Sequence, residues 1–273
     1  MEKKSGKILL ALILSAGILS AYSLIEPYLM EVKQIGVESK DIPESFDGKK
    51  VVFISDIHYG PFFSKERVRD LVTEVNDLAP DLIVIGGDYV DHSSEDISSC
   101  FEELRNLKAP LGVYGVLGNH DHWGRENLTH EKMTEAGITP LDNKAVWISL
   151  VGERIKLGGV GDLWHDTQNI SPTIDGVGVD DFIVLLSHNP DYAEKIKTDK
   201  VDLVLSGHTH DGQVTFFWLW APYTNSKYGQ KYRSGFVDTK YAKVYVTRGI
   251  GTTILPIRFF ARPEITVLNL KRV

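Results

Sequence analysis

From Val51 onward the chain alternates short runs of β-forming residues with amphipathic helical segments. Residues 51–54, 82–85 and 113–117 have the composition of buried strands, and the segments between them repeat apolar residues at helical spacing. Strands joined through helices pair in parallel with right-handed crossovers, so the pattern predicts an α/β fold. Five further β runs are expected at 155–160, 182–186, 201–205, 244–247 and 265–270.

Side chains that can bind metals follow five of these predicted strands. The carboxyl ends of parallel strands meet at one edge of a sheet, and sites are built there. Residues two apart in extended backbone face the same way, so Asp56 and His58 can reach one metal cluster. The same spacing holds for His208 and His210. The complete set of candidate ligands is Asp56, His58, Asp88, Asn119, His188, His208 and His210.

The donor types in this set constrain the metal. The only cysteine, Cys100, cannot build a thiolate site alone. Oxygen and imidazole donors suit manganese, iron or zinc, and we favour manganese. Seven candidate ligands are too many for one tetrahedral ion, whereas two divalent ions sharing a carboxylate would use them all.

The ordered motifs resemble one family. Asp-x-His, Gly-Asp-x-x-Asp, Gly-Asn-His-Asp, a lone His and Gly-His-x-His occur in this order and look like those of the calcineurin-like metallophosphoesterases. The resemblance covers about residues 51–270. It implies an α/β fold of four layers, an αββα sandwich of two sheets flanked by helices.

The same resemblance implies roles for the motif residues. His120 would be the acid that protonates the leaving oxygen, and Asp91 would orient it. Asp88 would bridge the two ions. One ion would be held by Asp56, His58, Asp88 and His210, and the other by Asp88, Asn119, His188 and His208.

The chain also departs from parts of the family. Protein phosphatases have arginine after Gly-Asp-x-x-Asp, where this chain has His92, so a phosphoprotein substrate is not favoured. Later motifs are similar to the membrane-associated bacterial phosphodiesterase branch, which includes UDP-2,3-diacylglucosamine hydrolases and usually has glycine where this chain has Asp211. That carboxylate would either repel phosphate or point to solvent. Arg248 and Arg258 are the cations first expected to contact phosphate.

The N-terminal segment 8–25 has 18 residues without a charge. As a helix it would be about 27 Å long, close to the hydrocarbon thickness of about 30 Å. Lys3, Lys4 and Lys7 precede it, which predicts a cytoplasmic N-terminus and an extracytoplasmic catalytic domain. A cleaved signal peptide, with a secreted product, and a domain on the cytoplasmic face remain alternatives.

Three regions are expected: an anchor or signal segment at 1–30, a strand and connector at 31–50, and the phosphoesterase domain at 51–273. A formal net charge of −7 disfavours sequence-independent binding of nucleic acid. We predict a membrane-anchored hydrolase in which a hydroxide bound by two metals attacks a phosphodiester or pyrophosphate of a small-molecule or lipid substrate, with no protein partner predicted. Alternatives are a UDP-2,3-diacylglucosamine diphosphatase of lipid A biosynthesis and a metal-stabilised scaffold without turnover.

Overall fold

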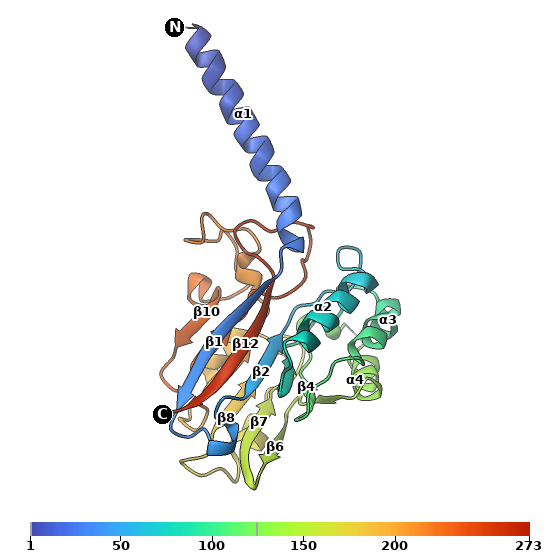
Figure 1. Ribbon diagram of the computed structural model, residues 1–273, viewed down its shortest axis with the longest axis vertical. Coiled ribbons are helices and arrows are strands. Elements are labelled where there is room, and N and C mark those ends of the chain that lie inside the picture. The colour runs from blue at the N-terminus through green and yellow to red at the C-terminus, as the bar shows by residue number, and fades with distance from the viewer. Residues whose placement is uncertain (1, 124) are drawn as a thin grey trace.

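The computed structural model describes residues 2–123 and 125–273 (Figure 1). The first element, α1 (Glu2–Ile25), is one helix of 24 residues that projects from the rest of the molecule. The segment Gly6–Tyr28, which includes most of α1, is long and apolar enough to cross a membrane, and the 18-residue window that meets this test has no buried residue. The side chains of Lys3 and Lys4, on which the predicted orientation partly depends, lie outside the described residues.

The first sheet has six strands in the order β1-β12-β2-β3-β4-β5. The last four of these are parallel to one another, β12 is antiparallel to β2, and β1 is parallel to β12. The strands are β1 (Glu31–Ser39), β2 (Lys50–Ile54), β3 (Leu82–Ile85), β4 (Val113–Gly115), β5 (Ile138–Pro140) and β12 (Glu264–Arg272). Segment 31–50 therefore supplies an edge strand of this sheet in addition to a connector.

The second sheet also has six strands, in the order β10-β11-β9-β8-β7-β6. Its four central strands are parallel, and the two edge strands are antiparallel to their neighbours. The strands are β6 (Lys144–Leu150), β7 (Glu153–Gly159), β8 (Ile183–Leu186), β9 (Leu203–Ser206), β10 (Gly235–Asp238) and β11 (Lys243–Val246).

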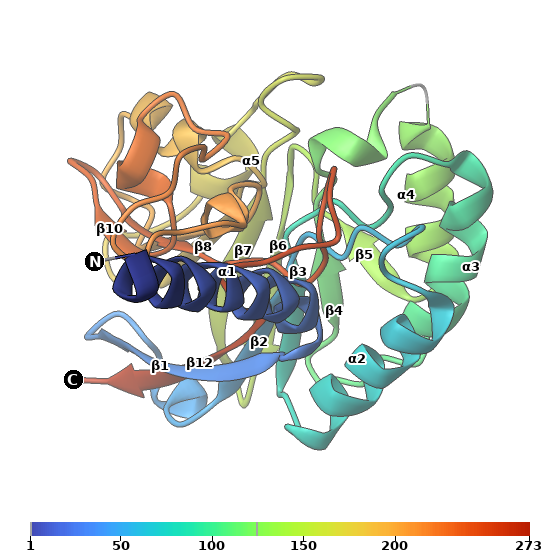
Figure 2. The same ribbon diagram turned by 90° about the horizontal axis from the view of Figure 1, so that it is seen from above.

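Helices cover the outer face of the first sheet and line one side of the molecule in Figure 2. They are α2 (Lys65–Asp77), α3 (Ser94–Leu104) and α4 (Glu126–Glu135). The outer face of the second sheet is covered more lightly, by α5 (Ser171–Ile174), the 3₁₀ segment Pro190–Lys195 and loops. The expected mixed α/β sandwich of two sheets is confirmed, and its fourth layer consists of short helices.

The alternation of side chains along β2 builds two cores. Val51 and Phe53 face the second sheet, whereas Val52 and Ile54 face the helices. Successive side chains in a strand point to opposite faces, so a strand covered on both sides must be apolar throughout. This explains why β2 and its neighbours carry unbroken apolar runs that sequence analysis can find.

Sequence analysis did not predict β5, β6 or β10. Each of them is an edge strand of its sheet or is very short, and the side chains of β10 are half-exposed or exposed. An edge strand with a solvated face does not need a continuous apolar run, so its sequence signal is weak.

Candidate metal centre

The candidate ligands lie in loops that leave the carboxyl ends of the central strands, and five of them have a left-handed backbone. These residues are not in extended backbone, so the expectation that residues two apart face the same way because the backbone is extended was wrong for them. A left-handed conformation is costly for residues other than glycine, and such residues gather at functional sites. The values of φ are 57° for Asp56, 48° for His58, 54° for Asp88, 70° for His208 and 52° for His210.

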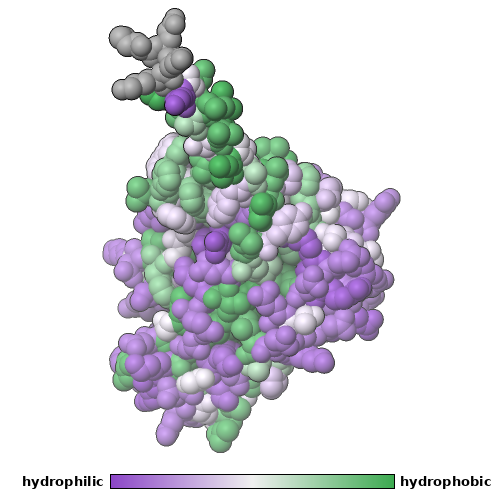
Figure 3. All heavy atoms as spheres, turned by 45° about the horizontal axis from the view of Figure 1, so that its top comes forward, coloured by the Kyte–Doolittle hydropathy of each residue, from purple (hydrophilic) through white to green (hydrophobic). Residues whose placement is uncertain are grey.

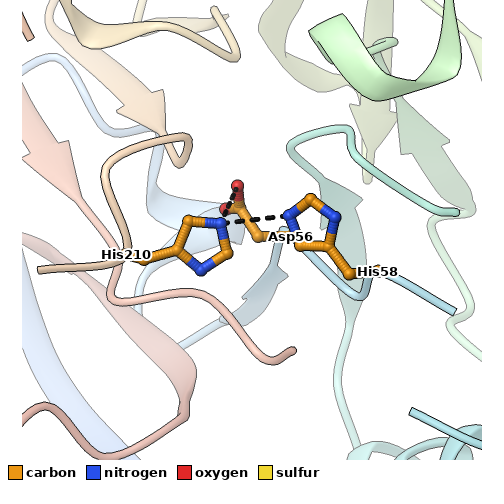
Figure 4. A group of neighbouring side chains, drawn as sticks. All are labelled: Asp56, His58 and His210. Carbon is orange, nitrogen blue, oxygen red and sulfur yellow. Dashed lines mark hydrogen bonds and ion pairs between the residues drawn. The ribbon is translucent and has the colours of Figure 1, made fainter. Parts of the chain in front are cut away.

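Asp56, His58 and His210 form the first ligand group (Figure 4). The Nε2 atoms of His58 and His210 are 3.0 Å apart, and Asp56 Oδ1 lies 3.4 Å from His210 Nε2. All three side chains are buried. Three donor atoms from two strand ends thus point to one small volume.

Asp88, His188 and His208 form the second ligand group. His188 Nε2 lies 3.3 Å from Asp88 Oδ2 and 3.2 Å from His208 Nδ1. The side-chain oxygen of Asn119 is 3.2 Å from the same His188 nitrogen, so an amide oxygen joins this group.

Asp88 Oδ2 connects the two groups. It is 3.5 Å from His58 Nε2 in the first group and 3.3 Å from His188 Nε2 in the second. A single carboxylate oxygen therefore faces both sets of donors, which is the arrangement that a bridging ligand requires.

The donor set fits divalent cations. Ligand atoms about 2.0–2.2 Å from one ion lie about 3.0–3.5 Å from each other, which matches the spacing within both groups. His58 and His210 direct ring nitrogens at each other, at a distance that two ligands of one ion would also have. Nitrogen and oxygen donors without thiolate suit manganese, iron or zinc.

Burial sets the protonation of the imidazoles. It lowers the pKa of His58 and of His208 to about 3 and takes the pKa of His210 well below its usual value. These rings are therefore neutral at pH 7, and a metal ligand must have its lone pair free. Burial acts in the same sense on His188, but the charge of Asp88 outweighs it and raises the pKa of His188 to about 10. A proton there balances the buried carboxylate, as a cation would.

A second layer of hydrogen bonds holds the ligand loops. The buried Asp121 carboxylate accepts hydrogen bonds from the backbone N–H groups of Asp88, Tyr89 and Gly118, at 2.7 to 2.9 Å. The Nδ1 of His188 lies 2.8 Å from the Gly86 carbonyl, which directs its Nε2 to the site. Such partners fix ligand orientation. Sequence analysis quoted Asp121 as part of Gly-Asn-His-Asp but gave it no role.

His120 lies beside the first ligand group, with its ring 4.6 Å from that of His58. Its Nδ1 lies 2.7 Å from the backbone carbonyl of Asp91, whereas the nearest Asp91 carboxylate oxygen is 3.6 Å away. The Asp91 carboxylate instead contacts His92 Nδ1 at 2.7 Å. The contact through which Asp91 could orient His120 is therefore made by its main chain.

The two arginines expected at phosphate are engaged within the protein. Arg248 pairs with Glu31 and Glu264, each at 2.7 Å. Arg258 is fully buried, donates to backbone carbonyls, and has Nη2 3.4 Å from His210 Nδ1. Neither guanidinium is free to bind phosphate in this arrangement.

The Asp211 carboxylate was expected either to repel phosphate or to point to solvent, and the structure shows neither arrangement. Its side chain is buried, and Oδ1 pairs with Arg233 Nε at 2.6 Å and accepts from the Ser234 hydroxyl at 2.9 Å. It therefore neither points to solvent nor presents an uncompensated charge.

Two tryptophans that sequence analysis did not assign to the site lie at its rim. The ring of Trp164 is 4.5 Å from that of His208, and the ring of Trp123 is 4.7 Å from that of His120. Both indoles are about half-exposed. Trp164 follows the Gly-rich sequence 158–162, and nothing in that sequence shows that it meets a ligand loop 44 positions later.

A two-sheet sandwich with a shared-carboxylate cluster at its strand ends defines the class of metallophosphoesterases. The family model for calcineurin-like phosphoesterase matches residues 49–212, more than half of the chain. The chain belongs to this family, and it is a hydrolase acting on phosphoester bonds.

Relatives from three organisms agree with this family. The metallophosphoesterase YkuE of Bacillus subtilis is 36% identical, with 90% of this chain and 87% of YkuE covered. Phosphodiesterase YaeI of Escherichia coli is 32% identical, with 81% and 82% covered. A transmembrane protein with a metallophosphoesterase domain from Danio rerio is 33% identical, with 96% of this chain and 62% of the relative covered.

Proposed function

We propose that this protein is a membrane-anchored phosphodiesterase or pyrophosphatase that uses two divalent metal ions. The observation that carries the proposal is the position of Asp88 Oδ2 between the two ligand groups. The first ligand group with Asp88 would hold one ion, and the second ligand group with Asn119 would hold the other. Manganese is the favoured metal, with iron and zinc as alternatives.

When bound, the two ions would supply an activated water and stabilise the negative charge that develops on phosphorus. The protein supplies the proton for the leaving oxygen. The Asp91 carbonyl is placed to accept a hydrogen bond from His120 Nδ1–H at 2.7 Å, and this leaves Nε2 as the ring nitrogen that would face the leaving oxygen. A positioned acid of this kind protonates a leaving alkoxide as the bond to phosphorus breaks.

The contacts of α1 support an uncleaved anchor. Cleavage at the small-residue site Ala21-Tyr22-Ser23 would separate the helix from the domain on which it packs. The Ser23 carbonyl accepts from Arg258 N at 3.0 Å, and the Tyr22 ring packs against Phe259 and Phe260 at 6.1 and 5.9 Å. A signal peptide would have no need of these contacts.

We propose a lipid or envelope-associated phosphodiester as the substrate, since the charge distribution around α1 favours an extracytoplasmic domain. UDP-2,3-diacylglucosamine is the alternative if the domain lies in the cytoplasm. Cys100 is buried and cannot report on this topology, so Val179→Cys, at a position that is 91% exposed, is the better probe. Labelling of intact cells by an impermeant thiol reagent supports the extracytoplasmic domain, and labelling only after lysis reverses the ranking of substrates.

Purified full-length protein in detergent would be assayed with bis-aryl phosphodiester, monoester and nucleotide-lipid substrates, each with manganese, iron and zinc. We expect the phosphodiester to be hydrolysed fastest and hydrolysis to stop on chelation. No turnover of any substrate with any metal would favour the silent scaffold. His120 speaks against a scaffold, because binding metal alone does not require an acid beside the ions.

A further inference from the structure

The candidate metal centre lies at the end of the sheets where α1 joins the domain. β1 begins at Glu31, close after α1, and β12 runs parallel to it while β2 runs antiparallel to β12. β2 therefore ends where β1 begins, and Asp56 follows β2 directly. Arg258 also connects α1 to the candidate metal centre, because it contacts both Ser23 of α1 and His210 of the first ligand group.

Exposed aromatic side chains surround the base of α1. We call residues 216–220 the foot surface; their sequence is FFWLW, and each side chain is between 48% and 84% exposed. The rings of Phe217 and Trp218 pack on Phe260 at 5.2 and 4.5 Å, and Phe260 in turn packs on Tyr22 of α1. Figure 3 shows hydrophobic residues gathered around the point where the helix leaves the domain. Tryptophan is characteristic of membrane interfaces, so this surface suits the lipid headgroup region.

A groove of about 180 Å³ lies beside the candidate metal centre and shares His210 with it. Its lining includes the ligand His210, the aliphatic residues Ile254, Leu255 and Ile257, and the Tyr223 ring, together with polar residues such as Gln213 and Asn225. Ile254 and Leu255 are exposed at 78% and 54%, so the groove is open and apolar at these two residues. An aqueous substrate gains little from such a lining, whereas a hydrocarbon chain is favoured by its burial.

The polar side chains of Gln213 and Thr209 in the groove lining are already hydrogen-bonded within the protein. The Gln213 amide nitrogen donates to the carbonyls of Thr253 and Leu255, and its oxygen accepts from Thr253 N at 2.9 Å. The charge of Asp211 is balanced by Arg233. The groove therefore offers carbon surface to a ligand and no unpaired charge that would exclude an alkyl chain.

We propose that this groove binds one alkyl chain of a lipid phosphoester while its phosphate lies at the metal centre. The foot surface would rest in the membrane interface and bring the open end of the groove to the lipid. This inference rests on the proposed function, because it names the substrate class of the same site. It also accounts for the direction in which the ligand loops open, toward the end that carries α1.

The inference is tested with a series of alkyl phosphates from methyl to hexyl, used well below their micelle concentrations. Their inhibition constants would be measured against hydrolysis of bis(p-nitrophenyl) phosphate by the full-length protein in detergent. Each methylene buried in the groove should lower the inhibition constant by about three- to fourfold. We expect at least two of the five additional methylenes of hexyl phosphate to be buried, so that it binds at least about tenfold more tightly than methyl phosphate.

Leu255→Glu introduces a charge at the open end of the groove and should reduce this hexyl-to-methyl ratio to below about twofold. Because the ratio is taken within one variant, it does not depend on how active that variant is. Val179→Glu, at an exposed apolar position outside the groove lining, is the matched control and should keep the wild-type ratio. Leu255→Ala should give an intermediate ratio.

Calorimetric titration of the metal-loaded protein with methyl and hexyl phosphate gives the same ratio without turnover. If calorimetry shows an affinity that rises with chain length in a protein that hydrolyses none of the substrates, the groove proposal is supported and the proposed function is refuted. Normal hydrolysis with equal affinity for both ligands would overturn the groove and leave the proposed function intact. An unchanged ratio in Leu255→Glu would also overturn it.

Discussion

Replacing Arg258 with methionine tests how strongly the interior behind His210 depends on one guanidinium. This group is fully buried. Without it, the backbone carbonyls of Arg248, Gly251 and Ala261 lose the donor that the structure gives them. The Gly249 carbonyl keeps the backbone N–H of Glu264. An orphaned buried carbonyl costs at least about 1 kcal/mol, so the loss of stability should be about 3 kcal/mol.

For a chain of this size, about 3 kcal/mol corresponds to a fall of about 6–12 °C in the thermal midpoint. The midpoint would be measured by circular dichroism on the full-length protein in detergent, and metal content by elemental analysis. The Arg258 variant should also lose metal, because His210 loses the contact behind its ring. Arg105→Met, at an exposed position, should change neither quantity. A fall of less than 3 °C with full metal content would refute the reasoning.

Three further perturbations test other parts of the structure. Asp88→Ala should abolish hydrolysis and lower the metal content at both positions; two ions retained per chain would contradict the bridging role. His120→Asn should keep the metals and slow hydrolysis of alkyl esters by about 10²–10⁴, with a smaller loss for p-nitrophenyl esters, and equal losses would remove His120 from the acid role. Burial raises the pKa of Asp202 to about 6, so its charged form costs stability as the pH rises through 6. Asp202→Asn should therefore raise stability by about 1–2 kcal/mol at pH 8 and hardly at all at pH 4, after allowance for partial exposure; the same gain at both pH values would exclude this cause.

Much of the fold could be predicted because the buried strands and helices carry their pattern locally. The apolar run of β2 and the helical spacing of α2 each lie within a few residues. The meeting of the candidate ligands followed from parallel topology, which brings strand ends together. The left-handed backbone at Asp56 and His58 could not be predicted, because tertiary contacts impose it against local preference.

The arginines show where sequence reasoning has too little information. A guanidinium near the end of a phosphoesterase sequence is a natural candidate for phosphate. Arg248 instead meets Glu31, which is 217 positions away in the chain. Only the fold decides whether a cation faces the ligand or a buried carboxylate, and no spacing in the sequence encodes that choice.

The pairing of β1 with β12 has a consequence for biogenesis. Gln34 and Asn269 are hydrogen-bonded neighbours although 235 positions separate them. Until the ribosome has made β12, β1 lacks the strand that it pairs with, and β2 lacks its neighbour on one side. Closing so long a loop is slow, and this edge of the sheet cannot form until β12 has been made. With α1 in the membrane, as proposed, β1 would wait beside the bilayer, and β12 would have to reach it there.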